Sequence, residues 1–160
     1  MGNSMSEIIV ARCVASAIVF LQEGEALLKK KKDGVAFLGY YLAPCAANLA
    51  FSCELFLKAL IASENNGVIQ RGHELNELYY QLNPVTRYRM RVKYNSYKPV
   101  YDPEKPKSPR QSFDDCLATH NKAFEEWRYN FEKGKTISVE PTSLMCLTVS
   151  AYETYEEMYN

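Results

Sequence analysis

Apolar residues recur along most of the chain every three or four positions, which is the repeat of an amphipathic α-helix. The first long helix is expected over about residues 6–32, with Ser6 as its N-cap and the lysine run 29–32 at its end. The stripe that defines it is made by Ile9, Cys13, Ser16, Phe20 and Leu27.

A second helix is expected over residues 40–63, with Pro44 in its first turn. From Leu49 onward this segment is apolar nearly all round, which predicts a central buried helix. Glu54 and Lys58 interrupt it, four residues apart with the acid first, which is the favourable order for an ion pair. They therefore form either a structural pair or a polar spot in a cleft between helices.

Three further segments follow, the first a short helix opened by Arg71-Gly72-His73 and closed by Asn83-Pro84. Residues 85–97 alternate with the period of a strand, but no second strand is available to pair with them, so a helix is predicted. Four prolines then make residues 98–111 an extended loop.

The last third is predicted to hold two helices. The first begins with a capping box at Ser112 and Asp115, and its apolar stripe continues through His120 to Phe131, before Gly134. The second runs from about Pro141 to Tyr159 and carries a tyrosine stripe suited to a core or a dimer interface. The chain is therefore expected to be one domain, residues 1–160, folded as an all-α bundle of five to six helices.

Composition narrows the class of protein. The chain has 160 residues, of which 47% are hydrophobic and 24% charged, which excludes collagen-like, disordered and membrane-spanning proteins. Its five cysteines include no CxxC pair and only two histidines accompany them, so no metal site and no cofactor is expected. We expect a cytoplasmic protein with reduced thiols and no membrane contact.

Charge is uneven along the chain although the formal net charge is zero. Residues 84–110 carry a net charge of +6 and residues 111–160 a net charge of −5. The basic segment either contacts RNA phosphates or an acidic partner, or is neutralised by the acidic C-terminal third of the same chain or of a second copy. Its candidate contact residues are Arg87, Arg89, Arg91 and Lys93.

The common enzyme motifs are absent: there is no glycine-rich phosphate loop, no HExxH and no GxSxG. The polar residues that interrupt the apolar helices are the remaining candidates for a site. They are Glu54, Lys58, His73, Arg128 and Glu132.

Three segments resemble those of HEPN domains. Residues 48–61, NLAFSCELFLKALI, look like the second helix of that family, an apolar helix with a Glu followed by LKAL. Residues 72–79, GHELNELY, are similar to its GHxLxxLY segment. Residues 124–132, FEEWRYNFE, look like the FxxWRYxYE segment of a subset. Their order and spacing fit the family over residues 40–133.

The resemblance implies a helical bundle, commonly dimeric, of prokaryotic toxin–antitoxin or phage-defence systems. Many members are metal-independent ribonucleases whose signature is an Arg followed within a few residues by a His. This chain departs from the signature, because Arg128 occupies the place of that Arg but Lys133 stands where the His is expected. An ammonium with an ordinary pKa near 10.4 is a poor general base.

The sequence is therefore compatible with three functions. The first is a HEPN-like protein that binds RNA or a protein partner, such as an antitoxin or a nucleotidyltransferase-like protein, as a homodimer. The second is an active endoribonuclease in which Arg128 acts with His73, or with His120, as a non-standard catalytic pair. The third is a non-catalytic dimeric scaffold or partner-binding module.

Overall fold

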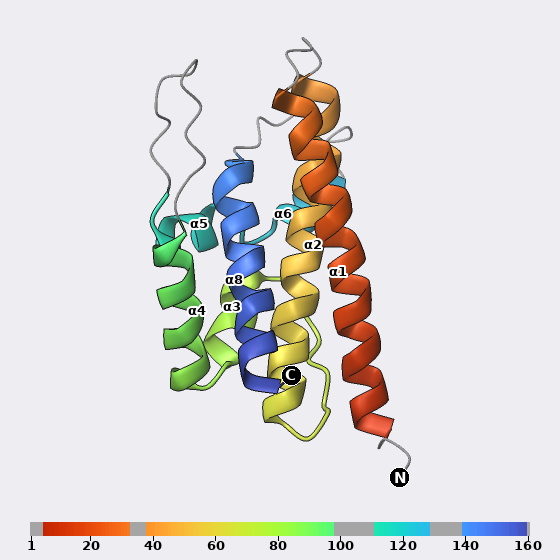
Figure 1. Ribbon diagram of the computed structural model, residues 1–160, viewed down its shortest axis with the longest axis vertical. Helices are drawn as coiled ribbons and strands as arrows, with labels where there is room; N and C mark the ends of the chain where they lie inside the picture. Colours follow the sequence, from red (N-terminus) through yellow and green to blue (C-terminus); the bar gives the residue numbers. More distant parts are fainter. Residues whose placement is uncertain (1–4, 33–37, 98–110, 129–138, 160) are drawn as a thin grey trace.

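In the computed structural model (Figure 1), the described residues are 5–32, 38–97, 111–128 and 139–159, and every regular element among them is a helix. This confirms the predicted all-α bundle. The helices are α1 (Met5–Lys32), α2 (Leu38–Glu64), α3 (Leu75–Gln81), α4 (Pro84–Ser96), α5 (Phe113–Thr119), α6 (Ala123–Arg128) and α8 (Pro141–Tyr159).

Helix α2 is the centre of the bundle. It runs antiparallel to α1 and also packs against α3, α6 and α8. Helix α8 lies between α2 and α4, and α1 begins at the end of the bundle where α8 finishes (Figure 1). The largest side chains of α2 are fully buried, among them Phe56, Leu57 and Leu60, as the all-round apolar sequence predicted.

By length and composition alone, residues 41–64 of α2 would also suit a membrane span, with a mean hydropathy of 1.5. In the bundle, however, 72% of the most apolar 18-residue stretch of this segment is buried inside the protein. The apolar side chains of this segment therefore form part of the protein core.

Helix α2 starts earlier than predicted, at Leu38, so Pro44 lies inside the helix and not in its first turn. Pro44 cannot donate a backbone hydrogen bond, and its own carbonyl accepts one from the Asn48 side chain at 2.7 Å. The prediction of a first-turn proline was wrong because the apolar pattern alone does not mark where a helix begins.

Helix α4 confirms the helical interpretation of residues 85–97. Asn83 caps it, its side chain accepting a hydrogen bond from the Thr86 amide at 2.9 Å, and Pro84 occupies the first turn. The buried residues Thr86, Met90 and Tyr94 follow a four-residue spacing, so the helical repeat decides which side faces the core. Residues 98–110, most of the predicted proline-rich loop, and Gly134 lie outside the described residues.

The single helix predicted after Ser112 is divided in two. The Ser112 cap is present, since its hydroxyl accepts from the Asp115 amide at 3.1 Å. However, α5 ends at Thr119, His120 is its C-cap, and α6 begins only at Ala123. The apolar stripe continued through this turn because both short helices bury residues in the same core. The last helix, α8, has the predicted bounds.

Candidate functional site

Three of the polar residues singled out in the sequence meet at one carboxylate; we call Glu54, Lys58 and His73 the polar cluster. The Glu54 side chain is 1% exposed, and its Oε1 lies 2.7 Å from Lys58 Nζ and 3.0 Å from His73 Nδ1. Lys58 is itself mostly buried, whereas the His73 side chain is 50% exposed. The cluster therefore joins a buried charge to an imidazole that solvent can reach.

The cluster exists because α2 places Glu54 and Lys58 on one face, four residues apart, inside an otherwise apolar helix. A buried carboxylate is costly unless it is paired and hydrogen-bonded, which makes the two contacts at Oε1 necessary for the fold. Its second oxygen, Oε2, is also buried and has no hydrogen-bond partner among the described residues. Buried polar atoms without partners are rare, and they concentrate at functional sites.

The loop before α3 carries His73 to this position. His73 was expected in the first turn of that helix, but α3 begins at Leu75 with Glu74 as its N-cap. The turn between α5 and α6 fixes this start, because Asn121 accepts hydrogen bonds from the amides of Leu75 at 3.1 Å and Asn76 at 2.8 Å. Lys122 pairs with Glu74 at 2.9 Å and, by hydrogen bonding, lowers the pKa of that carboxyl.

Helix α6 contributes an aromatic side chain, Phe124, beside the cluster. The Phe124 ring stacks on Phe51 of α2 at 4.5 Å and lies 6.3 Å from the His73 ring, centroid to centroid. The third HEPN-like segment begins at this phenylalanine. The side chains of Arg128 and Glu132 lie outside the described part of the structure, so the pairing of Arg128 with His73 stays a prediction.

His120, the other histidine, has a structural role inside the bundle. It is fully buried, its Nδ1 lies 2.8 Å from the Cys116 carbonyl, and its Nε2 accepts a hydrogen bond from the Glu140 amide at 3.2 Å. Burial lowers the pKa of this imidazole, which is therefore neutral and donates from Nδ1. With both ring nitrogens engaged by backbone, His120 joins α5 to the start of α8 and is not available to a substrate.

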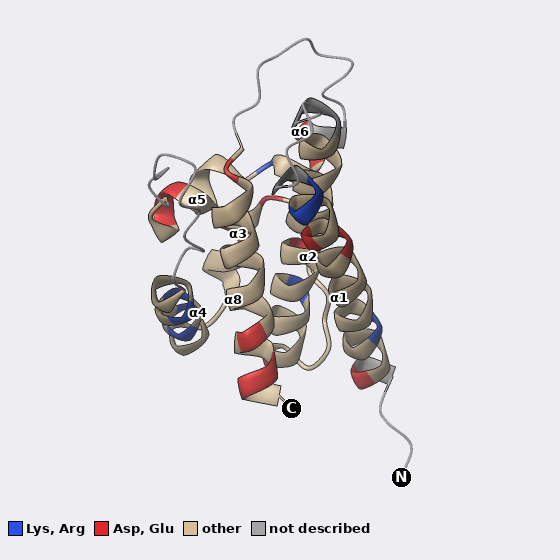
Figure 2. Cartoon of the chain, turned by 45° about the horizontal axis from the view of Figure 1, so that its top comes forward, with Lys and Arg blue, Asp and Glu red and all other residues tan. Residues whose placement is uncertain are grey.

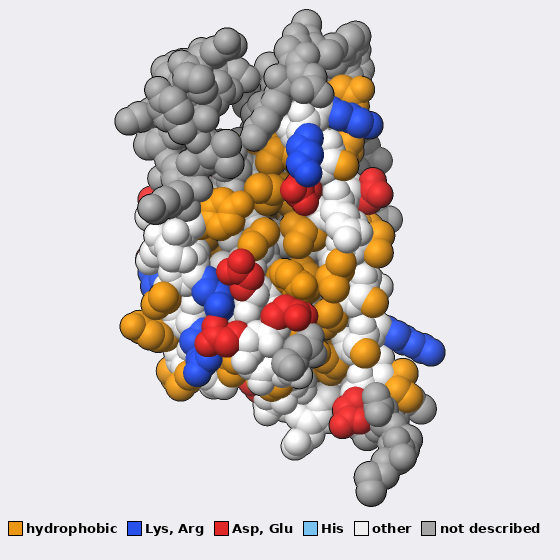
Figure 3. Space-filling model, in the orientation of Figure 1, with side chains coloured by type: hydrophobic (Ala, Val, Ile, Leu, Met, Phe, Trp, Pro, Cys, Tyr) orange, Lys and Arg blue, Asp and Glu red, His pale blue; other side chains and the backbone are white. Residues whose placement is uncertain are grey.

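Most of the basic residues of α4 are neutralised within the chain. Arg89 and Lys93 both pair with Glu157 of α8, and Arg91 makes two hydrogen bonds of 2.7 Å to Asp114. Figure 2 places the acidic end of α8 beside basic α4, and in Figure 3 basic and acidic side chains lie against each other over these helices. In the described part of the basic segment, acidic residues of the C-terminal third therefore neutralise three of the four basic residues of α4.

Arg87 differs from the other three because it has no ion pair among the described residues. Its guanidinium carbon lies 5.8 Å from the centroid of the Tyr80 ring, and its buried Nε finds no acceptor. It lines a shallow cavity of about 280 Å³ between α3 and α4. We call this the tyrosine–arginine pocket; its walls are Tyr79, Tyr80, Pro84, Arg87, Tyr88 and Arg91.

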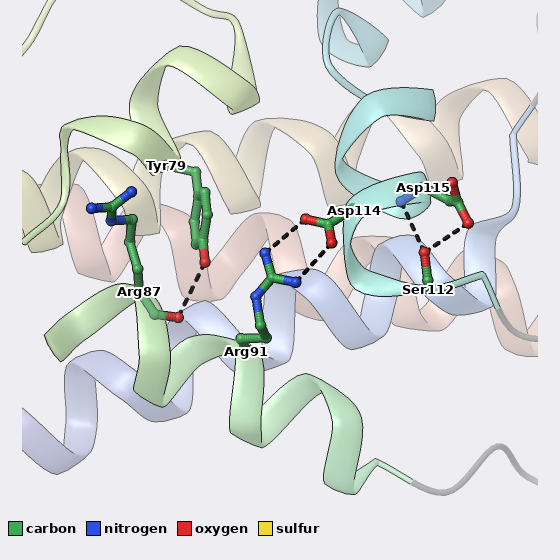
Figure 4. Close-up of polar contacts among 6 residues, drawn as sticks. All are labelled: Tyr79, Arg87, Arg91, Ser112, Asp114 and Asp115. Carbon is green, nitrogen blue, oxygen red and sulfur yellow. Dashed lines mark hydrogen bonds and ion pairs between the residues drawn. The ribbon is translucent and has the colours of Figure 1, made fainter. Parts of the chain in front are cut away.

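The tyrosines of this pocket were not among the site residues predicted from the sequence. Their signal was present, since Tyr79-Tyr80 and Tyr88 flank the turn at Asn83-Pro84, but only the tertiary structure shows which rings face outward. Figure 4 shows how the pocket is fixed: the Tyr79 hydroxyl donates to the Arg87 carbonyl at 3.2 Å, while Arg91 is held by Asp114.

No group of three or more metal-ligating side chains occurs among the residues that the structure describes. The chain was also compared with known proteins. Neither the protein-family models, nor the curated proteins, nor the solved structures include a match to it.

Proposed function

We propose that this chain is a HEPN-like helical protein of prokaryotic toxin–antitoxin or phage-defence type, and that it acts by binding RNA. The observation that carries the proposal is the polar cluster. Glu54 and Lys58 come from one HEPN-like segment and His73 from another, and all three side chains meet at one oxygen. This convergence supports a common site made by the two segments.

Phe124 adds the third segment to the same place, since its ring covers Phe51 and lies beside His73. A site in which residues from separate helices converge between packed helices is typical of helical bundles. The half-exposed imidazole gives this site an outer edge that a ligand can reach.

RNA cleavage is the second candidate function, and the orientation of His73 favours it. Glu54 faces Nδ1, which leaves Nε2 of a half-exposed ring for proton transfer. In such a reaction His73 Nε2 takes the proton of the ribose 2′-hydroxyl as the 2′-oxygen attacks phosphorus. The P–O5′ bond breaks, and the leaving 5′-oxygen takes a proton from solvent water. Lys58 supplies positive charge beside the imidazole.

One experiment separates the two functions. The purified protein is incubated with total RNA in EDTA, with cleavage followed on a gel and binding by filter retention. Binding without cleavage supports the first function, whereas cleavage that His73→Ala reduces at least a hundredfold supports the second. If the RNA is neither bound nor cleaved, both are overturned in favour of the protein-binding module.

Lys29 provides a matched control for Lys58. It pairs with Glu25 at the same four-residue spacing, at 3.0 Å, but on the exposed surface of α1. Lys58→Ala is expected to change RNA binding or cleavage, and Lys29→Ala to leave both unchanged. Equal effects of the two variants would mean that the RNA responds to overall charge and not to the polar cluster.

A further inference from the structure

We propose that the tyrosine–arginine pocket is a contact site for single-stranded RNA, in which a base stacks on Tyr88 and a backbone phosphate meets Arg87. This inference rests on the proposed RNA binding and locates it on a surface away from the polar cluster. It is carried by the charge of Arg87, which has no ion pair among the described residues, and by the exposure of two tyrosine rings that line the same pocket.

The aromatic part of the site is exposed to an unusual degree. Tyr88 is 69% exposed and Tyr80 59%, although tyrosine is on average only intermediate in its exposure. The two rings come from different helices and line the same cavity. Flat aromatic faces beside a cation are the features by which proteins hold unpaired bases.

The charge of the site is concentrated on Arg87. The other basic residues of α4 are held by Glu157 or Asp114, so they attract a phosphate less than their number suggests. The guanidinium carbon of Arg87 lies 5.8 Å from the centroid of the Tyr80 ring, and the guanidinium has no ion pair and its Nε no acceptor among the described residues. A phosphate oxygen would supply the missing negative partner.

The dimensions of the site favour one base. A volume of about 280 Å³ is at the lower limit of the roughly 300–1,000 Å³ of small-molecule pockets, and the cavity is shallow. A pocket of this size accommodates one planar base, while the rest of the RNA strand stays outside it. The backbone that forms it is fixed, since the Tyr79 hydroxyl donates a hydrogen bond to the Arg87 carbonyl (Figure 4). Asn83 also caps the start of α4.

The test uses the full chain and a fluorescent single-stranded oligoadenylate whose 2′-O-methyl groups prevent cleavage, with binding followed by anisotropy in EDTA. Tyr88→Ala is expected to weaken binding about 5- to 100-fold, which corresponds to the loss of one stacked base. Tyr88→Phe keeps the ring and is expected to bind within about twofold of the parent. Tyr88 is exposed, so neither variant disturbs the core.

Arg87 is tested through salt. The slope of log binding constant against log salt concentration is expected to become shallower by about 0.7 in Arg87→Gln, because one phosphate contact is lost. Arg12→Gln, which removes an exposed arginine of α1, is the matched control and is expected to keep the parent slope. Thermal unfolding of each variant confirms that it is folded.

The outcomes distinguish this inference from the proposed function. If the parent binds RNA and both Tyr88→Ala and Arg87→Gln bind equally well with the same salt slope, the pocket assignment is overturned while RNA binding stands. If the parent binds total RNA but not the oligonucleotide, the pocket assignment is overturned while RNA binding stands, and if it binds neither, both are overturned. Loss of a protein complex in Tyr88→Ala, with RNA unbound by the parent, would assign the pocket to a protein partner.

Discussion

His73 and His120 have the same side chain but opposite environments. His73 lies against the buried carboxylate of Glu54 and is half exposed, whereas both nitrogens of His120 are engaged by backbone groups inside the bundle. In the sequence both were candidate partners of Arg128 in a catalytic pair. The difference depends on contacts with Glu54 and Glu140, which lie 19 and 20 positions away in the sequence. A pattern within one helix does not reveal such contacts.

His120 makes stability depend on pH. Its pKa is lowered by burial, so the unfolded chain binds a proton near pH 6.5 while the folded chain does not. The free energy of unfolding is therefore expected to decrease as the pH falls below about 6.5, and to stop decreasing below the lowered pKa. Denaturant unfolding between pH 8 and pH 5 measures this decrease.

The matched variant is His120→Gln. It is expected to be about 1–3 kcal/mol less stable than the parent at pH 8, because the buried amide of Glu140 loses its acceptor. Its stability is also expected to vary less between pH 6.5 and pH 5. A variant that keeps the full pH dependence would show that another group is responsible.

At the scale of the helices, α1 packs against α2 through a close approach between Gly24 and Leu49. A methyl group added at Gly24 would lie 2.7 Å from the side chain of Leu49, which is fully buried. The Cys45 thiol also reaches the Gly24 carbonyl, at 3.4 Å. Gly24 is therefore required by packing, although glycine within a helix costs about 1 kcal/mol relative to alanine.

Gly24→Ala is expected to lower the free energy of unfolding by about 1–2 kcal/mol, since overpacking outweighs the gain in helix propensity. Thermal or denaturant unfolding measures the change. In a Leu49→Ala background, which removes the clashing atoms, the same substitution is expected to stabilise. If Gly24→Ala destabilised both backgrounds equally, contact with Leu49 would not be the cause.

Over the whole molecule, the uneven charge of the sequence becomes a set of ion pairs between distant segments. The basic helix α4 meets Glu157 of α8 and Asp114 of α5, so much of the positive charge is neutralised internally. Lys93, with Arg89, lowers the pKa of Glu157, and Arg91 lowers that of Asp114. The structure leaves Arg87 as the member of this group without a carboxylate partner in the described residues.

These lowered pKa values predict acid sensitivity. The contribution of both carboxylates is complete above their ordinary values of about 4.5 and 3.8 and is lost as the pH falls through the lowered ones. Glu157→Gln is expected to reduce the fall in melting temperature below pH 4.5, whereas Glu153→Gln, an exposed residue of the same helix, is expected to behave as the parent. High salt is expected to weaken the difference.

The sequence by itself determined the all-α class, the central position of α2, the bounds of α8 and the pairing of Glu54 with Lys58. Each of these follows from spacing within one segment, because a helix repeats every 3.6 residues and its burial leaves a periodic trace. His73 was among the polar candidates of the sequence, but its contact with Glu54 became visible only in the structure.

Only the tertiary structure decided the break at His120, the neutralisation of α4 and the formation of the tyrosine–arginine pocket. Each depends on groups brought together from different helices, such as His120 with Glu140 or Arg91 with Asp114. The apolar stripe could not reveal the break because both halves face one core, and the charge counts could not reveal which cations are paired. Whether two charges pair depends on the distance between them in the folded chain, and the order of residues along the sequence does not give that distance.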